Sequence, residues 1–232
     1  MNNISPNKDE EKFVGKKKLS PYAIIAIVLG LCVIIFAFYM EARGNNAEPR
    51  REVGLQGVQY EIDSLDWIQQ ELLDVNPFSR PETRLESVTG VVIHNIGNPG
   101  TTALQNRNYF NNLAYTQRRH ASSHFIICLD GTILQCVPID EIAFASNERN
   151  DDTLSIELTH PDATGQFNEE TYDAAVRLSA WLLLEFGLTA NDLIRHHDIR
   201  DTTDCPRYFV NNEGTWEMFK ANVQSEMERL QQ

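Results

Sequence analysis

Positive charge is scarce in this sequence. Its 232 residues contain 20 lysines and arginines against 33 acidic residues, and the formal net charge is −13. Residues 1–20 hold five of the lysines and only three acids, so the rest of the chain carries 15 basic and 30 acidic residues. DNA and RNA bind to basic protein surfaces. We therefore expect no nucleic-acid partner.

Cysteine is scarce as well. The chain has four cysteines, and four do not form a disulfide framework in a chain of this length. Cys32 falls in an apolar run. Cys128 and Cys136 flank Asp130-Gly131, and a two-residue turn there would point the two thiols to opposite faces. A bridge between them requires a longer or bulged loop, so the sequence leaves their pairing open. Cys205 is the cysteine whose polar neighbours suit a chemical role.

One long apolar run is present. Residues 21–40 contain no charged residue, and twenty apolar residues in a helix match the hydrocarbon core of a membrane, which is about 30 Å thick. The lysines before the run predict a cytoplasmic N-terminus. The alternative is a cleaved signal peptide, but the run is long for one and no clear small-x-small site closes it. In either case we expect the chain beyond residue 40 to lie outside the cytoplasm.

Composition divides the chain into four expected parts. They are a cytoplasmic tail at 1–20, one transmembrane helix at 21–40, an extracytoplasmic stalk at 41–77 and a folded domain at 78–232. Within the stalk, Leu65, Ile68 and Leu72 recur at helical spacing and predict a short helix in Asp63–Asp74.

The folded domain alternates strand and helix patterns. Strands are expected at Val88–Ile93, at Ser123–Leu129 and Thr132–Val137 around an Asp130-Gly131 hairpin turn, and at Leu154–Thr159. Helices are expected from Thr101 or Thr102 to about Leu113, from Asn168 to about Phe186, and over Gly214–Leu230. This pattern predicts an α/β fold with a mixed central β-sheet flanked by helices.

Three residues have the chemistry of a catalytic zinc site. His196 and Cys205 are nine residues apart in a stretch rich in turn formers, and His94 ends the first expected strand. Two imidazoles and a thiolate would leave a fourth zinc position open to water. Taken one at a time, a histidine at a strand end is more often a hydrogen-bonded core residue, and a single cysteine is more often a small buried apolar residue.

Glu157 lies in the middle of an expected strand. Alternation places Ser155, Glu157 and Thr159 on one face of this strand. A solvent-exposed face would explain a glutamate there. The functional alternative is a general base beside a zinc-bound water.

In this order, the motifs resemble the zinc-dependent N-acetylmuramoyl-L-alanine amidases, a family that includes phage-lysozyme-type amidases and peptidoglycan recognition proteins. The resemblance covers about residues 78–225. It rests on His94, Ser123-His124-Phe125, Asp130-Gly131-Thr132, Ser155-Ile156-Glu157-Leu158, His196-His197-Asp198 and Cys205-Pro206.

The resemblance implies a role for each matched residue. His94, His196 and Cys205 match the three zinc ligands, and Glu157 matches the catalytic base of many bacterial members. Thr203 matches a position that is lysine in many members. The resemblance implies that the Thr203 hydroxyl would donate a hydrogen bond to a developing oxyanion.

The sequence also departs from the family pattern. Ser123 stands where some members have a catalytic tyrosine, so a tyrosine-based mechanism is not expected. The loop between His196 and Cys205 differs in length, which leaves His197 as an alternative ligand. His124 matches a histidine near the site with no assigned role, and His160 is expected in a loop.

The implied function is zinc-dependent hydrolysis of the amide bond between N-acetylmuramic acid and L-alanine in peptidoglycan. The implied protein is a single-pass, membrane-anchored bacterial enzyme with its catalytic domain outside the cytoplasm. Two alternatives remain open: a non-catalytic peptidoglycan-binding module of the same fold, and a zinc peptidase that acts on cell-wall peptides.

Overall fold

A computed structural model describes residues 55–232. The predicted tail at 1–20, the predicted transmembrane helix at 21–40 and the first part of the predicted stalk lie outside the described residues. The described residues belong to one compact unit, residues 51–232. Within 55–232, no helix is both long enough and apolar enough to cross a membrane.

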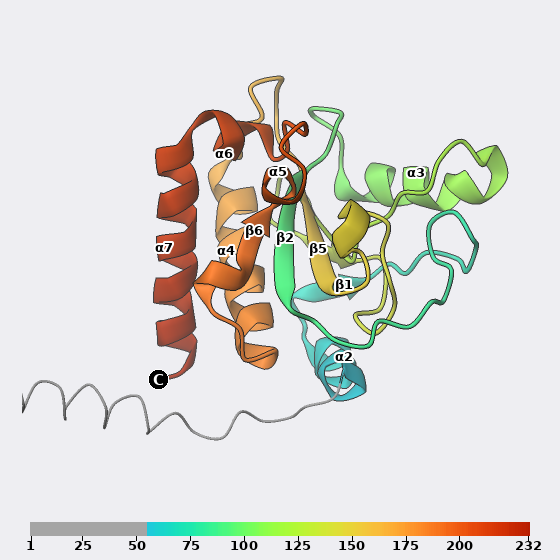
Figure 1. The fold of residues 1–232 in the computed structure, drawn as a ribbon. Helices are drawn as coiled ribbons and strands as arrows, with labels where there is room; N and C mark the ends of the chain where they lie inside the picture. The colour runs from blue at the N-terminus through green and yellow to red at the C-terminus, as the bar shows by residue number, and fades with distance from the viewer. Residues whose placement is uncertain (1–54) are drawn as a thin grey trace, which may run out of the picture. The chain divides into compact units, whose positions relative to one another are not determined.

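A six-stranded mixed sheet forms the centre of this unit (Figure 1). Its strands are β1 (Ile68–Gln70), β2 (Gly90–Asn95), β3 (Phe125–Ile127), β4 (Ile133–Gln135), β5 (Thr153–Leu158) and β6 (Leu193–Arg195). Their order across the sheet is β1-β4-β3-β5-β2-β6. The β3–β4 hairpin is antiparallel, and the other neighbouring pairs are parallel. The predicted α/β fold with a mixed central sheet is confirmed.

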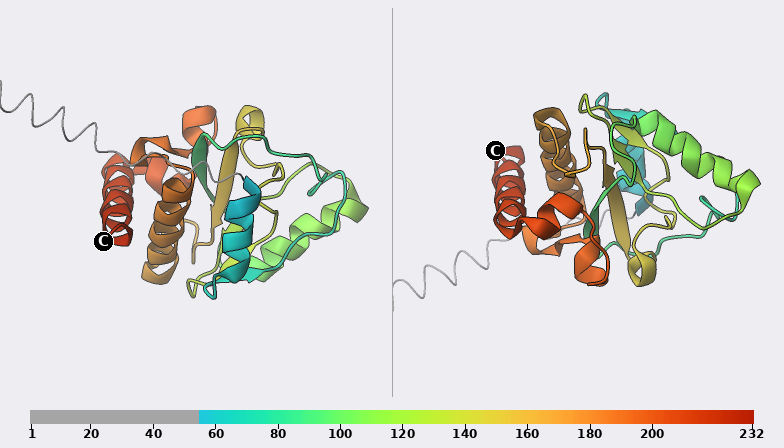
Figure 2. Two further views of the ribbon diagram at one scale, coloured as in Figure 1. Left: turned by 90° about the horizontal axis from the view of Figure 1, so that it is seen from below. Right: turned by 90° about the horizontal axis from the view of Figure 1, so that it is seen from above.

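Helices cover both faces of the sheet (Figure 2). α3 (Ala103–Thr116) packs against β3 and β4 on one face. α4 (Glu169–Glu185) packs against β2, β3 and β5 on the other face, and α7 (Glu213–Leu230) lies along α4. The remaining helical segments are α2 (Leu55–Ser64) beside β1, the 3₁₀ turns η1 (Asn147–Arg149) and η2 (Ala190–Asp192), α5 (His196–Ile199) and α6 (Arg207–Asn211).

Side-chain alternation along the strands separates two apolar cores. Leu154, Ile156 and Leu158 of β5 pack in the larger core, which α4 and α7 complete. Ile126 of β3 packs in the smaller core with the apolar side of α3. Because successive strand residues point to opposite faces, Glu157 of β5 points to the α3 side of the sheet.

Two of the three long predicted helices of the domain begin at their expected caps. The hydroxyl of Thr102 accepts from the backbone N–H of Gln105, and the side chain of Asn168 accepts from the backbone N–H of Thr171. Each contact satisfies one of the N–H groups that a helix start leaves unpaired. α3 runs to Thr116, three residues beyond its predicted end, and closes with Gln117 in the left-handed conformation.

The predicted helix at 63–74 is wrong. α2 ends at Ser64, and Ile68–Gln70 forms strand β1, which pairs in parallel with β4. Since this pairing satisfies backbone groups that β4 would otherwise expose at the sheet edge, the tertiary contact overrides the local helical spacing. Residues 55–77 are therefore folded in the structure, and the compact unit extends back beyond the predicted boundary at 78.

The hairpin at Asp130-Gly131 exists, but its loop is longer than a two-residue turn. Phe125 pairs with Gln135, and the backbone N–H of Cys128 donates to the carbonyl of Thr132 over 2.8 Å, so three residues form the loop. Gly131 closes it with φ +80°, as expected for a three-residue hairpin loop. Cys128 and Cys136 remain free thiols.

Replacing Gly131 by alanine should destabilise the fold by roughly 1–2 kcal/mol, the usual penalty for a side chain in the left-handed region. The added Cβ would also lie 3.1 Å from the carbonyl oxygen of Glu170. The matched control is Gly214→Ala in α7, where an added Cβ meets no atom within 4 Å and which should be neutral or slightly stabilising. Urea denaturation of both variants checks this, and equal stabilities would contradict it.

Candidate functional site

The register of three parallel strands places the predicted residues side by side. His94 of β2 pairs with Glu157 of β5, and both lie at the carboxyl ends of their strands. On the other side of β2, Ile93 pairs with Arg195, the last residue of β6. The residue after Arg195 is His196, whose ring centroid lies 4.7 Å from that of His94. This edge of an α/β sheet is where ligands usually bind.

Cys205 reaches the same edge because the chain folds back after α5. The backbone N–H of His197 donates to the carbonyl of Cys205 over 2.8 Å. The buried Arg195 holds the base of this loop through Asp198 at 2.8 Å and Glu213 at 2.6 Å. Asp198, the last residue of the His196-His197-Asp198 motif, pairs with Arg195.

His94, His196 and Cys205 form a cluster that could hold a metal ion. One donor atom from each lies within 4.8 Å of the other two. The Sγ of Cys205 lies 3.8 Å from Nδ1 of His94, and Nε2 of His94 lies 3.3 Å from the hydroxyl of Ser146. Nδ1 of His94 therefore faces the cluster while Ser146 fixes the orientation of its ring. The side-chain nitrogen of Asn147 lies 2.5 Å from Nε2 of His196 and fixes the second ring.

Burial favours the neutral form of both imidazoles of the cluster. It lowers the pKa of His94 well below the ordinary value, and His196 and His124, when protonated, would repel a charge on His94. It also lowers the pKa of His196, to which the charge of Arg200 adds. For Cys205, burial and the neighbouring Glu157 charge raise the pKa of the thiol. Since neutral imidazole and thiolate are the ligand forms, a bound cation would compensate the cost of ionising Cys205.

Glu157 is a carboxylate without a local partner. Its Oε2 is buried and accepts no hydrogen bond in the structure. Burial raises the pKa of Glu157 to about 7, against the opposing effect of the Arg119 charge. A carboxyl group with this pKa exchanges protons near neutral pH, as a general base must. The solvent-exposed alternative for Glu157 does not apply, because its free oxygen faces the pocket and not bulk water.

His197 and Thr203 lie apart from the metal cluster. Nδ1 of His197 lies 2.8 Å from the backbone carbonyl of Thr203, so this ring is held within its own loop. Neither residue lines the pocket that contains Glu157. The structure therefore places His196 in the cluster and gives the Thr203 carbonyl a role in the loop.

The remaining predicted residues have hydrogen bonds that hold the fold. The hydroxyl of Ser123 donates toward the backbone carbonyl of Phe125 at 3.0 Å. His124 is buried between Ser155 Oγ at 3.0 Å and the carbonyl of Glu141 at 2.9 Å, and burial lowers the pKa of this histidine to about 4. The ring of His160 lies 2.7 Å from the carbonyl of Ile96. These contacts make all three residues structural supports.

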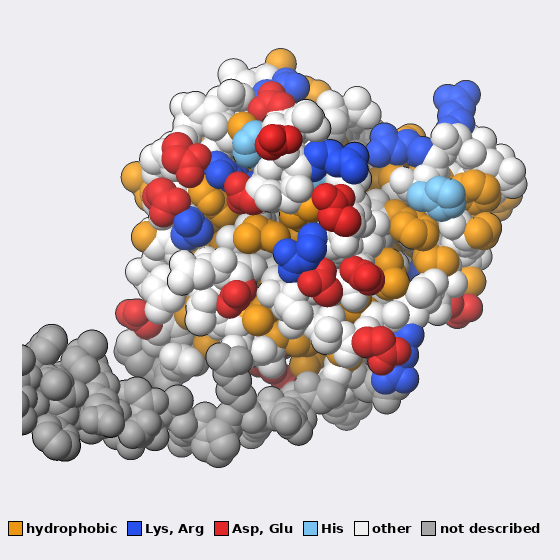
Figure 3. All heavy atoms as spheres, in the orientation of Figure 1, with side chains coloured by type: hydrophobic (Ala, Val, Ile, Leu, Met, Phe, Trp, Pro, Cys, Tyr) orange, Lys and Arg blue, Asp and Glu red, His pale blue; other side chains and the backbone are white. Residues whose placement is uncertain are grey.

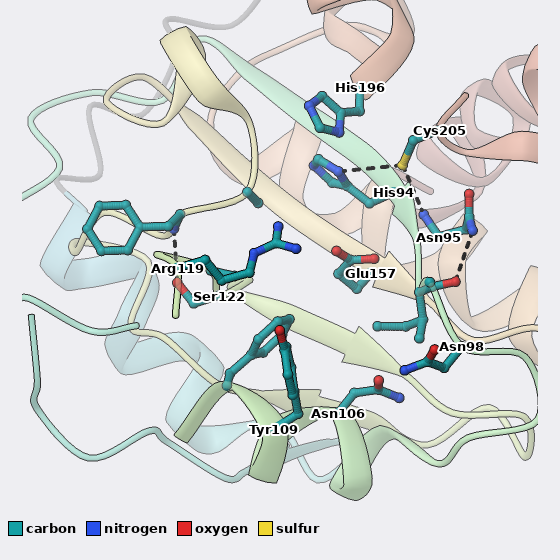
Figure 4. A pocket seen from close by; sticks show the side chains of 16 residues that line it. His94, Asn95, Asn98, Asn106, Tyr109, Arg119, Ser122, Glu157, His196 and Cys205 are labelled. Atoms are coloured by element: carbon teal, nitrogen blue, oxygen red, sulfur yellow. Dashed lines mark hydrogen bonds between the residues drawn. The ribbon is translucent and has the colours of Figure 1, made fainter. Parts of the chain in front are cut away.

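A pocket of about 390 Å³ opens over the cluster and Glu157. Figure 4 shows the metal-cluster residues at one end and the side chains of Asn98, Asn106, Tyr109 and Arg119 around the rest. Sequence reasoning missed these four residues. They come from α3 and from the loops on either side of it, and no local motif identifies them.

Glu157→Gln should change how the stability of the metal-free protein depends on pH. Because the folded-state pKa of about 7 lies above the ordinary 4.5, the unfolded chain loses its proton first as pH rises. Wild type therefore loses stability between about pH 4.5 and 7, by up to about 3 kcal/mol. Glutamine has no proton to lose, so relative to wild type the variant should be more stable at pH 8 than at pH 5.

Urea denaturation of the metal-free chain at the two pH values checks this prediction. Glu217→Gln is the matched control, since the Glu217 side chain is 60% exposed. If the stability of Glu157→Gln changed between the two pH values by the same amount as that of wild type, the assignment of a raised pKa would be contradicted.

Comparison with known sequences identifies relatives. A profile of N-acetylmuramoyl-L-alanine amidases matches residues 84–208, more than half of the chain. A probable N-acetylmuramoyl-L-alanine amidase of Bacillus licheniformis is 31% identical over 163 residues, which span 65% of this chain and 45% of the relative. The amidase CwlL of Bacillus licheniformis is 27% identical over 170 residues, spanning 68% and 47%. The chain spans about half the length of the curated relatives it matches.

Solved structures share the fold. PlyL superimposes with a TM-score of 0.58 at 20% identity, covering 68% of this chain and 98% of PlyL. The catalytic domain of XlyA gives a TM-score of 0.55 at 23% identity, covering 67% and 98%. The profile match contains His94, Glu157, His196 and Cys205. This chain belongs to the N-acetylmuramoyl-L-alanine amidase family.

Proposed function

We propose that this protein is a zinc-dependent amidase that hydrolyses the bond between N-acetylmuramic acid and L-alanine in peptidoglycan. The observation that carries the proposal is the buried, unpaired Oε2 of Glu157 in the same pocket as the His94, His196 and Cys205 cluster. Membership of the amidase family supports the choice of bond.

The donor set fits zinc. Two imidazole nitrogens and one thiol sulfur are donors that zinc favours, and three protein ligands leave one position open. Ser146 and Asn147 hold the two rings in place, as supporting partners do in metal sites. When bound, zinc supplies a Lewis acid that polarises the amide carbonyl and lowers the pKa of a water molecule.

Glu157 is the proton carrier of the proposed reaction. Its unpaired Oε2 accepts a proton from the attacking water and then donates it to the nitrogen of the leaving L-alanine. Burial favours protonation of this group and a bound cation would favour its ionised form, so the same carboxyl group can both accept and donate the proton. Thr203 does not line the pocket, so the proposal gives its hydroxyl no step.

We also propose that residues 21–40 anchor the protein in a membrane, with residues 1–20 in the cytoplasm and the amidase domain outside it. Twenty residues without a charge, preceded by Lys16-Lys17-Lys18, support this orientation. A domain facing the cell wall would meet peptidoglycan directly.

Glu157→Gln should abolish hydrolysis while zinc binding persists. Loss of a general base costs about 10²- to 10⁴-fold in rate, and the variant keeps all three metal ligands. The assay incubates purified peptidoglycan with the full chain and follows soluble peptides by mass spectrometry, with zinc content measured on the same samples. Glu217→Gln, exposed on α7, is the control and should match wild type.

The products separate the proposal from its two rivals. An amidase releases stem peptides that begin with a free L-alanine amino group. Binding without release would make the protein a non-catalytic module, and cleavage within the stem peptide would make it a peptidase. Full activity of Glu157→Gln would contradict the role assigned to the carboxylate.

A further inference from the structure

Arg119 directs a positive charge into the active pocket. It lies in the segment between α3 and β3, and Figure 4 shows its guanidinium pointing across the pocket toward the space between His94 and Glu157. It is the one lysine or arginine among the residues that line the pocket. Its charge is close enough to Glu157 to oppose the effect of burial on that carboxyl group.

This guanidinium has no partner among the residues that the structure describes. No hydrogen bond or ion pair joins it to Glu157 or to another side chain. By contrast, Arg80, Arg149 and Arg195 each pair with a carboxylate at 2.6–2.7 Å. An arginine whose planar fork points into a pocket with its donors unused can bind a ligand carboxylate through two parallel hydrogen bonds.

The charges around the pocket favour an anionic group at this point. Arg119 is the one side chain lining the pocket that always carries a positive charge. Over the face shown in Figure 3, acidic and basic side chains are interspersed, so a free carboxylate finds its complementary charge locally and not in a broad basic patch.

The neighbours of Arg119 suit the peptide part of a substrate. Asn98, Asn106 and Tyr109 line the same pocket and carry amide or hydroxyl groups. Tyr109 is 49% exposed, so its ring and hydroxyl are accessible to a bound chain. Neutral polar groups of this kind pair with peptide N–H and carbonyl groups, whereas the guanidinium pairs with a carboxylate.

We infer that Arg119 binds a free carboxylate on the peptide part of the substrate, so that the enzyme prefers acidic stem peptides to amidated ones. The inference rests on the proposed amidase function and adds the substrate class of the same site. Arg119 acts on recognition, so its loss should raise KM more than it lowers kcat.

The test uses two muramoyl dipeptides that differ in one group. The second residue carries a free α-carboxylate in one and a carboxamide in the other. For the full chain loaded with zinc, kcat/KM should favour the carboxylate substrate by about tenfold or more, the usual effect of a charged hydrogen bond. Arg119→Gln should bring this ratio near one, chiefly through KM. Arg119→Lys, which keeps the charge without the fork, should give an intermediate ratio.

Arg118→Gln is the matched control. Arg118 and Arg119 are both exposed, but Arg118 does not line the pocket, so its replacement should leave the ratio at the wild-type value. A wild-type enzyme that does not discriminate, or an Arg119→Gln variant that still does, would overturn the inference while the amidase function stands.

A binding measurement separates the two proposals. Calorimetry of the metal-free chain with the same dipeptides measures recognition without turnover, and the carboxylate form should bind about tenfold more tightly in wild type but not in Arg119→Gln. If neither dipeptide nor peptidoglycan is cleaved, the amidase proposal fails and this binding ratio alone decides the inference. Equal affinities in wild type would overturn it.

Discussion

The pairing of β5, β2 and β6 is the constraint on which the site depends. Parallel register sets His94 beside Glu157, and it places Arg195 so that His196 follows directly beside His94. A shift of one residue in either pair would turn a functional side chain to the opposite face of the sheet. The apolar residues that alternate with these side chains along the strands pack beneath α4. Their packing therefore sets the positions of the active residues as well as the core.

The same arrangement creates an electrostatic cost that a cation relieves. Without a metal, burial raises the pKa of both Glu157 and Cys205, and the charge of Glu157 raises the pKa of Cys205 further. A divalent cation beside both groups would stabilise the thiolate and the carboxylate together. Arg119 contributes a smaller compensation from the other side of the pocket. The site thus requires positive charge, of which Arg119 supplies only a part and a bound cation would supply the rest.

Local patterns predicted the parts of the site that strands and caps control. The alternation of apolar and polar residues predicted the strand face of Glu157, and an apolar run ending in histidine predicted the strand-end position of His94. Both positions depend only on residues nearby in the sequence. Strand β1 was missed because its pairing with β4 joins segments some 65 residues apart. Arg119 and Tyr109 were missed for a similar reason, since the packing of α3 against β3 and β4 brings them to the pocket and leaves no periodic signal.

Zinc content measured on three purified chains tests the central claim most directly. Wild type should hold one zinc ion per chain, Cys205→Ala should lose it, and His197→Ala should retain it, because the ring of His197 is bonded to the Thr203 carbonyl outside the cluster. Zinc that persists in Cys205→Ala, or that disappears in His197→Ala from a folded chain, would contradict the ligand set on which the proposed chemistry depends.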